Sequence, residues 1–181
     1  MRLLSAALWV AASWTLLASG LGPVLAFSLA AAALLVTRRA HTRPLPASAL
    51  IACVLAGAFS YPLWAGAVTW SGGLLGLASR ASVRAPGLLE ASTMLTAGPI
   101  FEELLYRERL LPAVERCAGT GFALLASTAA FALPHLDPWS TLAAAWVGPA
   151  LGTLYLITRN VWACVGAHAG VNAAALWVAT L

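Results

Sequence analysis

A long run without charge near the start of the chain limits what this protein can fold into. Residues 3–36 contain no Asp, Glu, Lys or Arg. As a single helix rising about 1.5 Å per residue, the run would extend about 50 Å, well beyond the roughly 30 Å hydrocarbon core of a bilayer. The segment from Gly20 to Pro23 offers a break. We therefore predict two short membrane helices, over about residues 3–19 and 23–37.

The composition of the whole chain also indicates an integral membrane protein. Hydrophobic side chains make up 61% of the 181 residues and charged ones only 9%, whereas a soluble domain has about 25% charged residues. All ten basic residues are arginine, and no basic stripe carries interleaved aromatic residues, so we expect no nucleic-acid partner. The three cysteines have no paired spacing, which predicts neither a disulfide framework nor a thiolate metal site.

Further apolar runs extend this pattern to the end of the chain. We predict an all-α polytopic membrane protein of about seven transmembrane helices, enclosing an intramembrane polar cavity. It forms one domain over residues 1–181, in which 1–86 supply N-terminal helices and 87–181 the core with the polar motifs. The other five spans are expected over about residues 47–70, 88–111, 120–136, 139–158 and 161–181, with a loop at 71–86 and a connection holding Arg109, Glu115 and Arg116.

The arginines predict how these helices cross the membrane. Cytoplasmic loops carry an excess of Lys and Arg, and a basic group stands between the second and third predicted helices. That rule places the N-terminus inside and the C-terminus outside, with the first apolar run kept as an uncleaved helix rather than removed as a signal peptide. Six arginines then lie on the inner side and two on the outer side, namely Arg38, Arg39, Arg43, Arg109, Arg116 and Arg159 against Arg80 and Arg84.

Charge inside the fourth predicted span requires an explanation. Glu102, Glu103 and Arg107 occur there within six residues, and acids in hydrocarbon are functional candidates because they are costly to bury. On a helix, Glu103 and Arg107 lie on one face and can pair, while Glu102 points about 100° away. A salt-bridged patch where the helix leaves the membrane is the structural alternative.

Two histidines in other predicted spans favour a functional explanation. His135 and His168 lie in separate apolar segments, and Asn172 follows His168 by one helical turn. A single intramembrane histidine is usually a satisfied core residue, but two of them with an unpaired carboxylate predict a shared polar site. There, Glu102 could act as general base on a water that His135 positions. His168 and Asn172 could donate hydrogen bonds to the developing oxyanion.

The order of these motifs resembles a known family. Glu102-Glu103-x-x-x-Arg107, Phe131-x-x-x-His135 and His168-x-x-x-Asn172 on successive segments are similar to the three motifs of the CPBP family of intramembrane glutamic endopeptidases. That family includes the CAAX prenyl proteases, bacterial proteins of bacteriocin processing or immunity, and the myxosortases.

The resemblance implies a metal-independent, cofactor-free endopeptidase acting on a membrane-anchored protein or peptide. From the short, compact form of the chain we expect a bacterial inner membrane. It assigns water activation to Glu102 and His135, oxyanion stabilisation to His168 and Asn172, and supporting roles to Glu103, Arg107 and Phe131. Glu108 departs from the family pattern, in which glycine often occupies that position.

Other functions stay open at this stage. A non-proteolytic immunity or scaffold protein of the same fold would keep these side chains without turning over a substrate. A zinc protease is disfavoured because no HExxH helix is present. A proton-coupled transporter is disfavoured because the chain lacks repeat symmetry.

Overall fold

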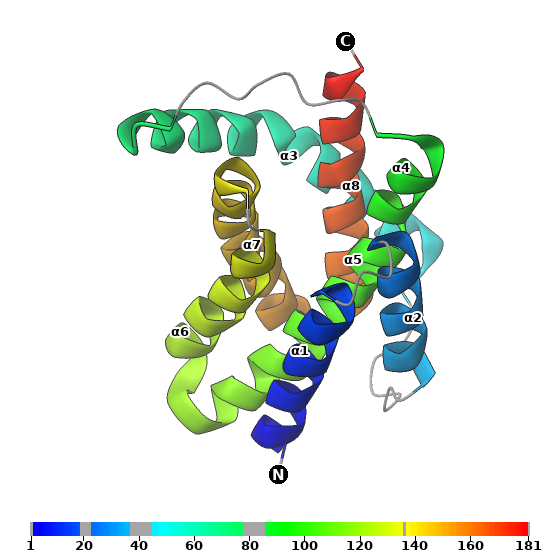
Figure 1. The fold of residues 1–181 in the computed structure, drawn as a ribbon, viewed down its shortest axis with the longest axis vertical. Helices are drawn as coiled ribbons and strands as arrows, with labels where there is room; N and C mark the ends of the chain where they lie inside the picture. The colour runs from blue at the N-terminus through cyan, green and yellow to red at the C-terminus, as the bar shows by residue number, and fades with distance from the viewer. Residues whose placement is uncertain (1, 19–22, 37–44, 78–85, 136, 181) are drawn as a thin grey trace.

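The computed structural model describes residues 2–18, 23–36, 45–77, 86–135 and 137–180. Within these ranges the ordered elements are all helices, as expected for an all-α protein (Figure 1). They are α1 (Arg2–Ala18), α2 (Pro23–Val36), α3 (Ala47–Leu74), α4 (Leu88–Leu95), α5 (Ala97–Glu103), the π-helix η1 (Leu104–Leu110), α6 (Leu111–Ala132), the 3-10 turn η2 (Leu133–His135), α7 (Pro138–Thr158) and α8 (Val161–Ala179).

The helices are those of a multi-pass membrane protein. Four helical runs of the described residues are long and apolar enough to cross a membrane, and α1 and α2 are shorter apolar helices of 17 and 14 residues. The four runs are Ala47–Leu74, Leu88–His135, Pro138–Thr158 and Val161–Ala179. Two of the predicted spans are therefore parts of a single run, Leu88–His135.

The predicted connection between the fourth and fifth spans is wrong. Arg109 lies in η1, and Glu115 and Arg116 lie in α6. Pro112 does not end a helix, because it lies in the first turn of α6, directly after the π-helix η1. The chain turns instead at Gly119, whose φ of 81° and ψ of 167° interrupt α6 and produce the bend near the bottom of Figure 1.

A second interruption separates α4 from α5. Thr96 has φ −129° and ψ −82°, outside the helical region. Pro99 explains why the helix is interrupted at this point, because proline has no N–H to donate to the carbonyl of Leu95, four residues earlier. The break therefore lies just before Gly98 and Pro99. After α5 the backbone widens into η1, a rare form that is frequent at functional sites.

Glycines let α3 and α8 touch backbone to backbone. A Cβ atom on Gly57 of α3 would collide with the Ala167 carbonyl of α8, and one on Gly170 would collide with the Val54 carbonyl of α3. Gly170 belongs to the GxxxG spacing that begins at Gly166, a pattern that permits close helix approach in lipid. This crossing holds α8 against α3 in Figure 1.

We expect Gly57→Ala to destabilise the protein by about 1–3 kcal/mol, because the added methyl group forces apart two packed backbones. Thermal stability in detergent, followed by size-exclusion chromatography after heating, measures this effect. The matched control is Gly66→Ala on the same helix, where an added Cβ meets nothing within 4 Å. Equal melting temperatures for the two variants would contradict the packing role of Gly57.

Candidate active site

The centre of the polar site is a fully buried ion pair. Arg107 Nε lies 3.2 Å from Glu103 Oε2, and both side chains have 0% exposure. The i to i+4 spacing read from the sequence thus brings the two charges together across the α5–η1 junction. Arg107 also donates from Nη2 to the Gly148 carbonyl of α7 at 3.2 Å. Its guanidinium covers the Phe131 ring of α6, 4.4 Å from the centroid, so one arginine connects three helices.

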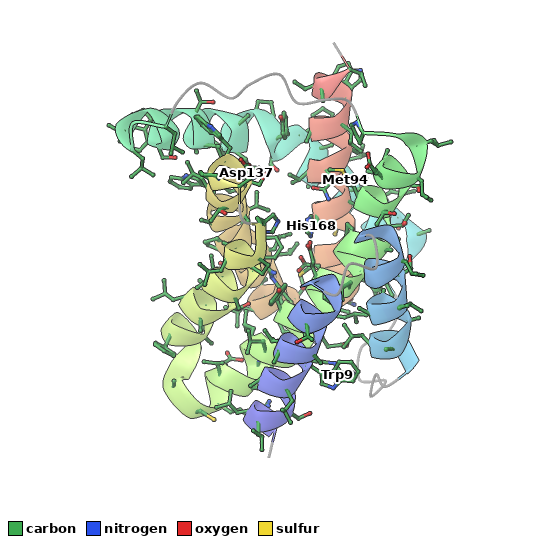
Figure 2. The ribbon with its side chains drawn as sticks, viewed as in Figure 1. Trp9, Met94, Asp137 and His168 are labelled. Atoms are coloured by element: carbon green, nitrogen blue, oxygen red, sulfur yellow. The ribbon has the colours of Figure 1, made fainter. Side chains whose placement is uncertain are left out.

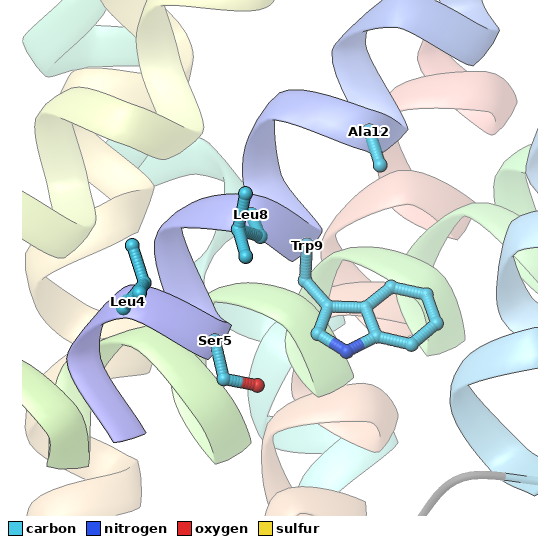
Figure 3. Close-up of a pocket in the computed structure, with 5 residues that line it drawn as sticks. All are labelled: Leu4, Ser5, Leu8, Trp9 and Ala12. Atoms are coloured by element: carbon cyan, nitrogen blue, oxygen red, sulfur yellow. The ribbon is translucent and has the colours of Figure 1, made fainter. Parts of the chain in front are cut away.

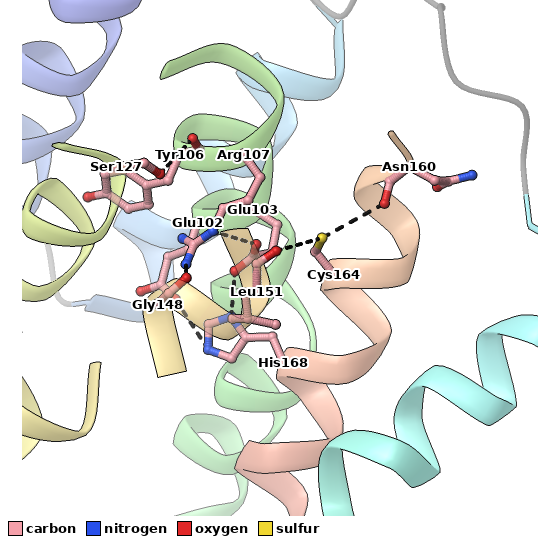
Figure 4. A network of polar contacts seen from close by, with 10 residues as sticks. All are labelled: Glu102, Glu103, Tyr106, Arg107, Ser127, Gly148, Leu151, Asn160, Cys164 and His168. Carbon is pink, nitrogen blue, oxygen red and sulfur yellow. Dashed lines mark hydrogen bonds and ion pairs between the residues drawn. The ribbon is translucent and has the colours of Figure 1, made fainter. Parts of the chain in front are cut away.

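His168 of α8 completes this cluster (Figure 4). Its Nδ1 lies 2.9 Å from Glu103 Oε1, and its Nε2 lies 3.6 Å from Glu102 Oε2. Arg107 places a positive charge beside Glu103, and the contact of Glu103 with His168 Nδ1 is short enough for a hydrogen bond. The adjacent glutamates therefore face opposite nitrogens of one imidazole. Glu102, with 15% of its side chain exposed, is the more accessible carboxylate.

Phe131 holds the second histidine near the first. Its ring packs edge-to-face against His168 with the centroids 5.7 Å apart, and against His135 with the centroids 5.4 Å apart. His135 lies in η2, at the end of α6. Its buried Nδ1 has no hydrogen-bond partner in the described part of the chain, and buried polar atoms of this kind often bind a water or a ligand.

Asn172 of α8 contacts the end of α4. Its side-chain amide donates to the Met94 carbonyl at 2.8 Å, just before the break at Thr96. The sequence placed Asn172 on the same helical face as His168 but gave no sign of this contact, because nothing in the sequence links residue 94 to residue 172. One of the two amide hydrogens is thereby engaged.

The sequence also did not predict the polar contacts between η1 and the neighbouring helices. Ser127 of α6 donates to the Tyr106 carbonyl at 3.1 Å, in a buried position. The Gly148 carbonyl receives Arg107, as described above. The only signal for Gly148 was its GxxxG spacing with Gly152, which indicates close packing and not an acceptor.

A pocket elsewhere on the molecule has different chemistry. It lies along α1 and is lined by Leu4, Ser5, Leu8, Trp9 and Ala12 (Figure 3). Its lining is apolar except for the serine, and no lining residue is ionisable. The Trp9 ring also packs under the Arg109 guanidinium at 4.7 Å. This pocket holds none of the groups that the predicted chemistry needs. Within the described ranges, no group of three or more His, Cys, Asp or Glu side chains is arranged to hold a metal ion.

We expect Arg107→Met to destabilise the protein by about 3–5 kcal/mol, because it leaves Glu103 buried without a countercharge. Adding Glu103→Leu to that variant is expected to restore part of the loss. Thermal unfolding of the purified protein in detergent measures both effects. The control is Arg159→Met, which removes a pair with Glu115 whose arginine is 53% exposed and should cost at most about 1 kcal/mol. Equal losses for the two single variants would show that burial does not set the strength of the Glu103–Arg107 pair.

Among the comparisons with known proteins, only the one with family models gave a match. A family model described as type II CAAX prenyl endopeptidase Rce1-like matches residues 84–174. The match includes every residue of the predicted site, from Glu102 and Glu103 to His168 and Asn172. No curated protein and no solved structure matched the chain. Because the family model covers half of its length, and because four of the motif residues, Glu102, Glu103, Arg107 and His168, meet in one cluster, this chain belongs to the Rce1-like family of CAAX protease-type membrane endopeptidases.

Proposed function

We propose that the protein is an intramembrane glutamic endopeptidase, which hydrolyses a peptide bond near the membrane-anchored part of another polypeptide. The observation that carries this proposal is the arrangement of Glu102 beside an imidazole that a buried ion pair holds in place. It requires no cofactor. Its proposed location is the inner membrane of a bacterium.

Charge balance supports a working protonation state for the cluster. Unpaired charges are costly in a low-dielectric interior, and four ionisable groups contact one another here, namely Glu102, Glu103, Arg107 and His168. They sum to zero when both glutamates are ionised and His168 carries two ring protons. The other neutral arrangement moves one proton from His168 to Glu102. The first state supplies both a carboxylate base and an Nε2–H donor.

The hydrolytic step follows from that state. Glu102 removes a proton from a water molecule as its oxygen attacks the substrate carbonyl, and His135 orients the water. The carbonyl oxygen becomes an oxyanion, to which His168 Nε2 and the second amide hydrogen of Asn172 donate. Collapse of the tetrahedral intermediate breaks the C–N bond, and Glu102 returns its proton to the leaving amine. Glu103, Arg107 and Phe131 act by positioning His168 and His135.

Glu102→Gln tests this mechanism, because the amide is nearly isosteric but cannot accept the proton. We expect cleavage to fall by at least about 10²-fold, the contribution typical of general base catalysis. Mass spectrometry of membranes from matched expression strains would show precursors accumulating in the variant. The control is Glu90→Gln, an exposed acid at the start of α4. An unchanged precursor profile with a folded Glu102→Gln protein would favour a non-proteolytic scaffold or immunity protein.

The purified wild-type enzyme allows a test of metal independence. We expect cleavage to persist after prolonged treatment with a strong chelator, because the carboxylate itself activates the water. Activity with and without the chelator, on a substrate identified in the membrane profiles, gives the comparison. Loss of activity that added zinc restores would exclude the glutamic mechanism.

A further inference from the structure

Helix α3 lies outside residues 84–174, the region that the family model matches. It nevertheless contacts both α7 and α8, and Figure 1 shows it extending from α8 across to the start of α7. His168 belongs to α8, and His135 lies in η2, just before α7. One helix outside the matched region therefore connects the segments that carry the two histidines of the site.

The first half of α3 packs against α8 beside His168. The Gly57 backbone lies against the carbonyl of Ala167, one residue before His168. A Cβ on Gly166 of α8 would likewise crowd Cys53 of α3. Because no long side chains lie between the two helices here, α3 and α8 cannot shift past one another without a collision.

The second half of α3 packs against α7 through two tryptophans. A Cβ on the buried Gly72 would collide with the six-membered ring of Trp139, so this indole lies directly on the backbone of α3. Trp146, two turns further along α7, donates from Nε1 to Ser71 Oγ at 3.0 Å. These two contacts fix the start of α7 relative to α3.

Short hydrogen bonds connect the start of α7 to His135. The Asp137 N–H donates to the His135 carbonyl at 2.6 Å, and the Asp137 carboxylate caps α7 by accepting from Ser140 N at 2.8 Å. Figure 2 labels Asp137 at the start of α7 and His168 on α8. Trp139 follows His135 by only four residues, so a displacement of the Trp139 segment is transmitted to His135.

Side-chain contacts stabilise the middle of α3, between its two contact sites. Pro62 lies inside the helix there, and a proline removes one helical hydrogen bond. Trp64 Nε1 donates to Ser60 Oγ at 2.8 Å, and Ser60 Oγ donates to the Gly57 carbonyl at 2.7 Å. The Trp64 ring packs on a small apolar cluster that α7 and α8 share, formed by Val147, Leu151 and Ala167. The proline-containing stretch is therefore also held to both helices.

We propose that α3 sets the position of His135 relative to His168, and that Gly72 and Trp139 are positioning residues of the active site. This inference rests on the proposed function, in which His135 orients the attacking water. Moving the start of α7 away from α3 would shift His135 from its place beside Phe131, whereas Glu103 would still hold His168. A misplacement of about 1 Å at a reacting group can lower the rate by about 10²-fold.

Gly72→Ala in the full chain tests this role, because the added methyl group displaces the Trp139 ring. We expect kcat to fall by about 10-fold to 10²-fold with KM unchanged, on a substrate identified in the membrane profiles. The matched control is Gly73→Ala, which gains the same helix propensity but whose Cβ meets nothing within 4 Å. The loss caused by Gly72→Ala should shrink in a Trp139→Leu background, where the colliding ring is absent. Strict additivity of the two substitutions would contradict the proposed contact.

A second measurement follows His135 without turnover. The chain has three histidines, so carbon-13 labelling at histidine Cε1 gives three NMR signals, and His135→Gln identifies one of them. The chemical shift of that signal responds to the Phe131 ring, whose centroid lies 5.4 Å from that of His135. Gly72→Ala should shift the His135 signal, and Gly73→Ala should leave it in place. If Gly72→Ala does not fold, Ser71→Ala serves instead, because it removes the acceptor of Trp146 without adding bulk.

An unshifted His135 signal in the folded variant would overturn the proposal. An inactive wild-type protein in which Gly72→Ala shifts the signal would refute the proposed function and leave the placement of His135 by α3 intact. Active wild-type enzyme whose Gly72→Ala and Gly73→Ala variants have equal kcat would refute this inference alone.

Discussion

The ion pair between Glu103 and Arg107 is the interaction on which the rest of the site depends. Both side chains are fully buried, so each charge is tolerable only because the other is present. Glu103, beside Arg107, lies within hydrogen-bond distance of His168 Nδ1, while Nε2 of the same ring faces Glu102. Arg107 in turn fastens α7 through the Gly148 carbonyl and α6 through the Phe131 ring.

Irregular backbone makes this arrangement possible. The interruption at Thr96, the π-helix η1 and the bend at Gly119 all occur in the same helical run that carries the glutamates. Backbone groups freed within a membrane need partners inside the protein, and side chains of the site provide some of them. Asn172 satisfies the Met94 carbonyl, and Ser127 bonds the Tyr106 carbonyl. The site and the breaks in the helices therefore stabilise one another.

Local sequence patterns predicted the regular parts of the fold well. The uncharged runs placed α1, α2, α7 and α8 within two residues of their observed ends, because long apolar segments in a membrane have few alternatives to a helix. The helix boundaries in the middle of the chain were predicted less well. Arg109, Glu115 and Arg116 resembled a loop by charge, yet they lie in helices, and Arg159 in the α7–α8 turn pairs with Glu115 of α6. Charge alone does not distinguish a loop from a helix whose ions are paired by tertiary contacts.

By itself the sequence determined the membrane-embedded, all-helical class of the protein, its family, and the pairing of Glu103 with Arg107, because these follow from composition, motif order and helical spacing. It also identified Glu102, His135, His168 and Asn172 as the polar residues to explain. Only the tertiary structure decided that both glutamates face one imidazole, that Phe131 packs between the two histidines, and that Asn172 meets Met94. Those contacts join residues up to 78 positions apart, and such separations are set by how helices cross rather than by local pattern.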